Sequence, residues 1–259
     1  MTLPLAGRRI LVTRAAHQAA KLSKGLRALG AEPVEVPVLE IHPPESFTPL
    51  DAALRQLENF DWLILTSANT VRVLVERLAT VDSNPAGFSR MKVAAIGEAT
   101  AAAARQRGFQ VTFVPASYLA ESLVHGLIGG MSGLKILLAR AAVARDVIPE
   151  ALRMAGAEVV VVDAYRNVLP ENAPELLRAA LGQKLDAATF TSSSSVNHLA
   201  EAAKRSGVPF PFPGIPAISI GPITSQTLHE RGWDAAAEAN PSDIPGLIEA
   251  VSVFLQPRR

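Results

Sequence analysis

The sequence predicts an α/β protein made of two similar parallel-sheet domains that arose by internal duplication. Three observations predict this fold class. Short aliphatic and β-branched runs alternate with longer Ala/Leu-rich stretches, the same blocks occur twice in one order, and small hydroxyl residues follow several of the apolar runs. Strands of a parallel sheet are buried on both faces, and they therefore read as unbroken apolar runs.

The predicted strands follow one another from the N-terminus to the last third of the chain. In chain order they lie in RRILVT, VEVPV, DWLILT, KVAAIG, LKILLA, EVVVVDAY, DAATFT and PAISIG. A stretch of helical period separates most of these runs from the next. Strand and helix in alternation is the pattern of βα units with parallel strands.

Four blocks of the first half recur in the second half at offsets of 124 to 126 residues. With their first residues, the pairs are ILVTRAA (Ile10) and ILLARAA (Ile136), LRALGAE (Leu26) and LRMAGAE (Leu152), FDWLILTSANTV (Phe60) and LDAATFTSSSSV (Leu185), and IGEAT (Ile96) and IGPIT (Ile220). Packing does not require the shared Arg, Thr-Ser and Gly-x-x-Thr. A period of about half the chain predicts two domains, because solenoid units are much shorter.

Composition excludes several classes of function. Lys and Arg total 25 against 24 for Asp and Glu, which argues against a basic nucleic-acid-binding face. The chain has no cysteine, so disulfides and thiolate metal sites are excluded. Its N-terminus lacks the apolar core of a signal peptide, and no apolar run approaches the ~18 residues that cross a bilayer. We expect a cytoplasmic protein with no membrane partner.

Hydroxyl residues follow the third strand of each copy. Thr66 and Ser67 end WLILTS, and Ser192 and Ser193 belong to five consecutive hydroxyl residues after DAATF. Small hydroxyl residues cap helices, and the free N–H groups of a capped helix point to the carboxyl end of the sheet, where ligands bind. Capping alone explains one hydroxyl per junction, but not five.

A second junction, Gly-x-x-Thr, ends in Thr100 in one copy and in Thr224 in the other. A lone Gly-x-x-Thr is more often a strand–helix turn than a site, and its occurrence at matched positions favours a site. Arg14 and Arg140 lie in equivalent turns, where an anionic ligand or an ordinary salt bridge would occupy them equally well. Backbone N–H groups at helix starts also bind anions.

Acid–base candidates are few. The five histidines are dispersed without metal-ligand spacing, and the nucleophile elbow and the dinucleotide fingerprint are absent. Tyr165 ends EVVVVDAY and is one of only two tyrosines. A phenol at the end of a strand is able to donate a proton to a leaving group, and a packed boundary residue is an equally good interpretation of Tyr165.

The complete set of blocks resembles the uroporphyrinogen-III synthase family over essentially the whole chain. The resemblance rests on ILVTR, GAEPVEVPVLEI, DWLILTSANTV, AIGEAT, GAEVVVVDAYR, ATFTSSSSV and SIGPITSQTL followed by RGW. Ala15 departs from the family pattern, where a proline often follows the arginine. Ala141 departs as well, because Arg-Gly is common at that point.

The resemblance implies a domain-swapped arrangement in which the chain crosses between domains twice. Residues 1–38 and 167–259 are then expected to form one domain and residues 39–166 the other. A two-stranded hinge near residues 37–41 and 165–169 is expected to join them.

The resemblance also implies a lyase that needs no cofactor and no metal. Its substrate is hydroxymethylbilane, a linear tetrapyrrole with eight carboxylates, which it closes to uroporphyrinogen III with inversion of ring D. Hydroxymethylbilane synthase is an expected transient partner. Tyr165 matches the family tyrosine that assists hydroxide departure. The expected substrate-binding residues are Arg14, Thr66, Ser67, Thr100, Arg140, Ser192, Ser193 and Thr224.

Two interpretations without this reaction stay open. A two-lobed protein that closes on a small anion would use the same hinge and the same helix N-termini. A regulator, or a module of a larger enzyme, would keep the fold without activity.

Overall fold

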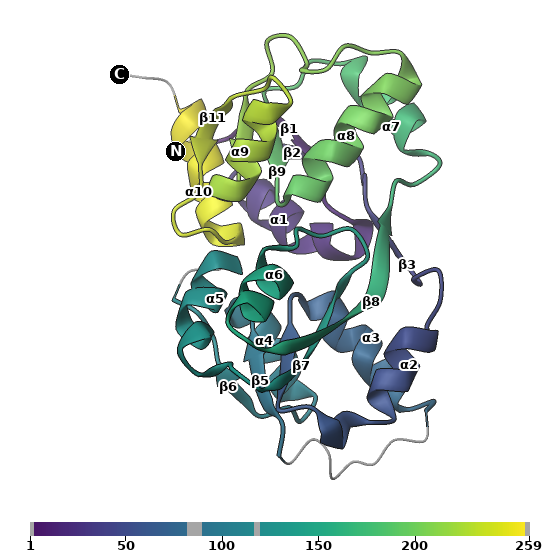
Figure 1. The fold of residues 1–259 in the computed structure, drawn as a ribbon. Helices are drawn as coiled ribbons and strands as arrows, with labels where there is room; N and C mark the ends of the chain where they lie inside the picture. Colours follow the sequence, from purple (N-terminus) through teal and green to yellow (C-terminus); the bar gives the residue numbers. More distant parts are fainter. Residues whose placement is uncertain (1–2, 82–89, 117–119, 257–259) are drawn as a thin grey trace. The chain divides into compact units, whose positions relative to one another are not determined.

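The computed structural model describes residues 3–81, 90–116 and 120–256 (Figure 1). The chain divides into two compact units, one formed by Met1–Glu40 and Val168–Arg259 (unit 1), the other by Ile41–Asn167 (unit 2). The chain passes from one unit to the other within β3 (Glu40–His42) and again within β8 (Glu158–Val168). Each unit contains one sheet with helices on both faces.

Unit 1 has a five-stranded sheet in the order β11-β10-β9-β1-β2, and all four strand pairs are parallel. Its elements are β1 (Arg9–Val12), α1 (Ala16–Ala28), β2 (Glu32–Glu35), α7 (Ala173–Leu181), β9 (Ala187–Phe190), α8 (Ser193–Ser206), β10 (Ala217–Ser219), α9 (Pro222–Glu230), β11 (Ala235–Glu238) and α10 (Ile244–Leu255).

Unit 2 has a six-stranded sheet in the order β3-β8-β7-β4-β5-β6. Besides β3 and β8, its elements are α2 (Thr48–Leu54), the short η1 (Leu57–Asn59), β4 (Trp62–Leu65), α3 (Ala68–Leu78), β5 (Lys92–Ala95), α4 (Glu98–Gln106), β6 (Val111–Phe113), α5 (Ala120–Leu127), the short η3 (Ile128–Gly130), β7 (Lys135–Ala141) and α6 (Val147–Met154).

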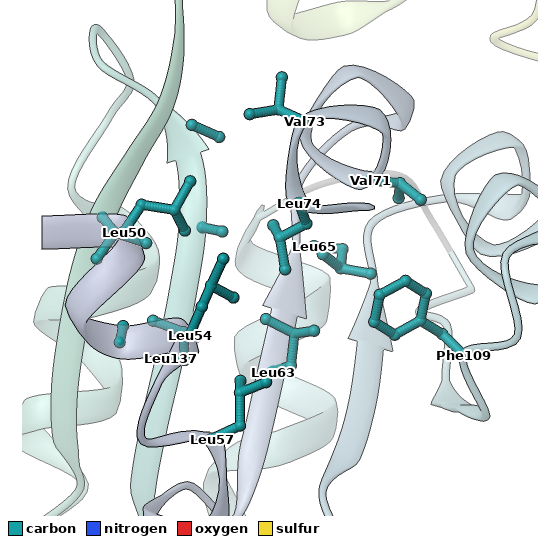
Figure 2. Packing of buried hydrophobic residues seen from close by; sticks show 14 of the residues in the cluster. Leu50, Leu54, Leu57, Leu63, Leu65, Val71, Val73, Leu74, Phe109 and Leu137 are labelled. Carbon is teal, nitrogen blue, oxygen red and sulfur yellow. The ribbon is translucent and has the colours of Figure 1, made fainter. Parts of the chain in front are cut away.

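The central strands are buried on both faces. Leu63 and Leu65 of β4 pack in one cluster with residues of α2 and α3, which Figure 2 draws, while Trp62 and Ile64 pack in a second cluster with α5 and α6. Successive side chains of a strand point to opposite faces, so a strand between two helical layers must be apolar at every position. This requirement explains the unbroken apolar runs of the sequence.

In each unit, the order in which successive strands are added to the sheet reverses at one place, toward one edge before it and toward the other edge after it. In unit 1 the chain moves outward from β1 to β2 and then from β9 to β11, and in unit 2 from β7 to β8 and from β4 to β6. In open α/β sheets, ligands bind beyond the carboxyl ends of the strands at such a reversal. The pairs β1–β9 and β7–β4 therefore mark the two places where polar residues are able to meet a ligand.

Candidate active site

Tyr165 lies near the end of β8, and its side chain is almost fully buried, with 6% of the residue exposed. Its hydroxyl oxygen is 3.1 Å from Oγ of Ser67. Both residues belong to unit 2. The structure thus joins two residues that the sequence singled out separately and that lie 98 positions apart.

Small side chains in β7 allow this contact. The sheet order is β8-β7-β4, so β7 separates the strand of Tyr165 from the strand that Ser67 follows. The register pairs Tyr165 with Ala141, and Ala139 and Ala141 belong to the same buried cluster as Tyr165. Alanine methyl groups on this face leave room for the ring to extend across β7.

Ser67 is the N-cap of α3. Its backbone is extended (φ −159°, ψ 160°), and its Oγ accepts a hydrogen bond from the backbone N–H of Thr70 at 3.1 Å. Oγ of Ser67 also lies 3.0 Å from Oγ1 of Thr70, whose side chain is completely buried. An N-cap of this kind satisfies one free N–H of the first turn and leaves the others directed past the helix end.

Burial raises the pKa of the Tyr165 phenol above its ordinary value of 10.0. Hydrogen bonds from the Ser67 and Asn69 side chains act in the opposite direction, but they are weaker than the desolvation. The phenol therefore keeps its proton throughout the neutral range, and its conjugate base has hydrogen-bond donors at hand.

Thr66 and Thr100 occupy the same edge of the unit 2 sheet. Leu65, which precedes Thr66, pairs with Ala95 of β5 and with Ala139 of β7, so the chain leaves all three strands at one edge. Thr66 donates a hydrogen bond to the carbonyl oxygen of Ala139 at 3.4 Å, which ties β4 to β7.

Ser192 and Ser193 begin α8 in unit 1. Ser192 is the N-cap, and its Oγ accepts a hydrogen bond from the backbone N–H of Ser195 at 3.2 Å, as Ser67 does from Thr70. Oγ of Ser193 accepts a hydrogen bond from Thr227 Oγ1 at 2.7 Å. This bond joins the first turn of α8 to α9.

Thr100 and Thr224 occupy matching positions in the first turns of α4 and α9. Both are buried, at 5% and 4% exposure, and neither hydroxyl has a hydrogen-bond partner within the described parts of the chain. Neither hydroxyl oxygen is among the fully buried polar atoms without a partner, so both reach the surface and are accessible to a ligand. The two hydroxyls thus form a matched pair of donors without a partner among the described residues.

The two equivalent arginines have different surroundings. Arg140 donates hydrogen bonds to the carbonyl oxygen of Arg145 at 3.1 Å and to Oδ1 of Asp146 at 2.6 Å. Arg14 makes no hydrogen bond or ion pair with any described residue, and burial lowers its pKa. At the offset of 126 residues, the position of Asp146 is occupied by Ala20 in the first copy.

The predicted residues thus form two groups. Within unit 2 the structure brings Tyr165 and Ser67 into contact and places Thr66, Thr100 and Arg140 at or beyond the same carboxyl edge of the sheet. Within unit 1 the corresponding group follows β1, β9 and β10, and it consists of Arg14, Ser192, Ser193 and Thr224.

Sequence reasoning missed one residue of the Tyr165 environment, Thr70, and it placed Asn69 at the junction after the strand without linking it to Tyr165. A hydroxyl three positions after an N-cap serine is a recognisable pattern, but it does not reveal that the capping Ser67 also contacts a tyrosine. It also missed Asp146 as the partner of Arg140, although an acidic residue six positions after an arginine at a helix start was visible.

Two grooves of unit 1 flank β11, with volumes of about 520 and 410 Å³, and contain none of the predicted residues. Within the described ranges, no three His, Cys, Asp or Glu side chains gather as metal ligands do. None of the described helices combines the length and the apolarity that crossing a bilayer requires.

Comparisons with known proteins agree with one another. The family model described as "Uroporphyrinogen-III synthase HemD" matches residues 20–249. A uroporphyrinogen-III synthase of Synechococcus elongatus is 37% identical over 253 residues, which are 96% of each chain.

Solved structures agree on the fold. A mutant uroporphyrinogen III synthase of Thermus thermophilus matches with a TM-score of 0.70 at 18% identity, over 96% of this chain and 99% of that one. The enzyme of Helicobacter pylori matches with a TM-score of 0.63 at 21% identity, over 95% of this chain and 99% of that one. From the family model and the Synechococcus relative, we conclude that the chain belongs to the uroporphyrinogen-III synthase family, the cyclising lyases of haem biosynthesis.

Proposed function

We propose that the chain converts hydroxymethylbilane into uroporphyrinogen III and that Tyr165 is the proton donor of this reaction. The observation that carries the proposal is the environment of the phenol. It is buried, it keeps its proton at neutral pH, and its oxygen lies 3.1 Å from Oγ of Ser67 at the start of α3. A general acid needs a proton to give and a stabilised conjugate base.

The chemistry follows from these groups. The Tyr165 phenol protonates the hydroxyl on the methylene group of ring A, and the C–O bond breaks with loss of water to give an azafulvene cation. Ring D attacks this electrophile through its already substituted carbon and forms a spiro intermediate. That intermediate fragments, and ring D closes in the inverted sense. A final deprotonation returns the proton, so the net change is ring closure with loss of one water.

The carboxylates of the substrate need donors that are not already used. The N-termini of α3, α4, α8 and α9 offer backbone N–H groups at the carboxyl edges of the two sheets, and anions are stabilised there. Thr100 and Thr224 add hydroxyls that have no partner among the described residues. We therefore assign acetate or propionate groups of the substrate to the first turns of α4 and α9.

Arg14 is the better candidate of the two arginines for a substrate carboxylate. Asp146 already neutralises Arg140, whereas Arg14 is partly buried and lacks a counter-ion in the described chain. A partly desolvated cation without a counter-ion gains more from an incoming carboxylate than one that is already paired. The proposed binding set is completed by Arg140, Thr66, Ser67, Ser192 and Ser193. The hydroxyl groups of the last four residues mainly shape the helix starts.

We also propose that residues 1–38 with 167–259 and residues 39–166 are the two working domains, and that the strands near residues 37–41 and 165–169 act as a hinge. The division of the chain within β3 and β8 supports this. The β1–α1–β2 segment lies in unit 1 and its repeat β7–α6–β8 lies in unit 2, each beside the later elements of the other repeat. An exchange of this segment between duplicated halves accounts for that arrangement.

A transient encounter with hydroxymethylbilane synthase in the cytoplasm fits this function. Free hydroxymethylbilane closes without catalysis to the type I isomer, so an enzyme that receives it directly from its source loses less of it.

The test is the isomer ratio of the product. Freshly prepared hydroxymethylbilane is added to the purified protein, the products are oxidised, and the type I and type III porphyrins are separated. We expect type III to dominate. A ratio equal to that of the spontaneous reaction would overturn the proposal and would favour a binding or regulatory protein of this fold.

A further inference from the structure

We propose that Thr70 is a positioning residue for Tyr165, and that it acts through Ser67 to direct the phenol proton away from the protein and toward the leaving group. The proposal rests on Tyr165 being the proton donor, as proposed above. It comes from counting donors and acceptors at a single atom, Oγ of Ser67.

Oγ of Ser67 is able to accept two hydrogen bonds and to donate one. It accepts one from the backbone N–H of Thr70, and it also lies within hydrogen-bond distance of Oγ1 of Thr70 and of the Tyr165 hydroxyl. The direction of the last two bonds is linked, because only one acceptor position remains. If the Thr70 hydroxyl donates to Ser67, then Ser67 must donate to Tyr165.

Burial of Thr70 decides which direction is taken. Its side chain has no exposed surface, and Oγ of Ser67 is the only partner of its hydroxyl in the described chain. A buried hydroxyl proton without an acceptor is costly, so the Thr70 hydroxyl donates to Ser67. This fills the second acceptor position of Ser67, and the Ser67 proton then points to the phenol oxygen.

Two consequences follow for Tyr165. Its proton cannot bond to Ser67, so it remains available to the leaving group. Its oxygen receives the Ser67 hydrogen bond, which stabilises the phenolate that forms once the proton has left. Hydroxyls in series polarise one another, so the Thr70 donor strengthens the Ser67 donor.

The duplicated half of the chain provides an internal comparison. Ser192 and Ser195 occupy the positions of Ser67 and Thr70 at an offset of 125 residues, and Ser192 caps α8 in the same way. Ser195, however, donates its hydroxyl proton to the backbone oxygen of Ser192 at 2.6 Å. Leu39 stands where the other copy has Tyr165. Leu39, Ser192 and Ser195 all lie in unit 1, whereas Ser67, Thr70 and Tyr165 lie in unit 2, so the chain of three hydroxyls occurs in the unit that has the phenol.

The experiment compares Thr70→Val, which removes the hydroxyl and keeps the branched shape, with Thr70→Ser, which keeps the hydroxyl. We expect Thr70→Val to lower kcat about fivefold with KM unchanged, the effect of one neutral hydrogen bond, and Thr70→Ser to restore kcat. Ser206→Ala is the matched control. It removes another buried helix hydroxyl, which bonds to Ala202 O, and should leave kcat unchanged.

Two further measurements separate positioning from a merely structural role. Thr70→Val added to Tyr165→Phe should cause no further loss of kcat. In a Tyr118→Phe background, where Tyr165 is the only tyrosine left, ultraviolet titration should give a higher phenol pKa for Thr70→Val than for Thr70, because the phenol is then free to donate to Ser67.

The outcomes distinguish this inference from the proposed function. The role of Thr70 is overturned by any of three results: an unchanged kcat in Thr70→Val, an equal loss of kcat in the Tyr165→Phe background, or an unshifted phenol pKa. None of these results contradicts the proposed cyclisation. A wild-type protein that produces only the spontaneous isomer ratio overturns the cyclisation. In that case the pKa comparison still decides whether Thr70 directs the phenol proton.

Discussion

Replacing Tyr165 by Phe removes one oxygen atom and keeps a buried ring in place. The ring packs against Ala139 and Ala141 in the core of unit 2, so the variant should fold. The Ser67 hydroxyl loses a partner 3.1 Å away, but it retains Thr70 Oγ1 at 3.0 Å. On the bond directions inferred above, the Ser67 proton loses its acceptor, and because Ser67 is only half-buried we expect the free energy of unfolding to fall by about 1 to 2 kcal/mol.

The effect on catalysis should be far larger than the effect on stability. A positioned general acid contributes about 10²- to 10⁴-fold to a rate, so we expect kcat for type III formation to fall at least about 100-fold. KM should change little, because a phenol that reacts with the leaving hydroxyl is not one of the proposed carboxylate anchors. The assay measures type III product against time, with the spontaneous type I product as an internal reference.

The pH dependence gives an independent check. Burial raises the pKa of Tyr165, so the acid form persists above pH 10.0, its ordinary value, and kcat should show no alkaline decline from this group below that pH. The part of the free energy of unfolding that is linked to this pKa also decreases only at alkaline pH. Unfolded chains lose this proton first, so the stability from the raised pKa is fully present below the unfolded value and is lost as pH rises through the folded value.

A Tyr165→Phe variant that keeps more than half of the wild-type kcat would refute the proposed role of Tyr165 as the proton donor.

Three further predictions follow from unpartnered polar groups. Arg14→Gln should raise KM about tenfold, as expected for a lost charge-assisted bond. Arg140→Gln should raise KM less, because Asp146 already pairs with Nη2 of Arg140, and equal effects in steady-state assays would contradict the assignment. Thr100→Val and Thr224→Val should each raise KM about fivefold, and an unchanged KM in both would remove the two helix starts from the site. Ser23→Ala deletes a buried α1 hydroxyl that has no partner among the described residues, and it should raise the free energy of unfolding by about 1 kcal/mol. A lower midpoint in thermal unfolding would contradict this prediction.

Local sequence determined the elements and the residues that end them. Most apolar runs became strands because two helical layers cover both faces of each sheet, as the packing of Leu63 and Ile64 into separate clusters illustrates. The run VEVPV is an exception, because the edge strand β2 (Glu32–Glu35) includes only its first two residues. Ser67 and Ser192 cap helices because a serine after a strand has an extended backbone and an oxygen in reach of the N–H three residues on. These are short-range effects, and the duplicated sequence repeats them.

The sequence could not show that Arg140 bonds to Asp146, or that Tyr165 reaches Ser67. ILVTRAA and ILLARAA are almost the same, but the segment after them has Asp146 in one copy and Ala20 in the other. The structure shows that Asp146 pairs with Arg140 and that Arg14 has no partner among the described residues. The phenol meets Ser67 across β7 only because the strand order and the register put Ala141 beside Tyr165. Sequence by itself determines short-range structure, since neighbours along the chain fix it, and tertiary structure decides contacts that depend on which strands are adjacent.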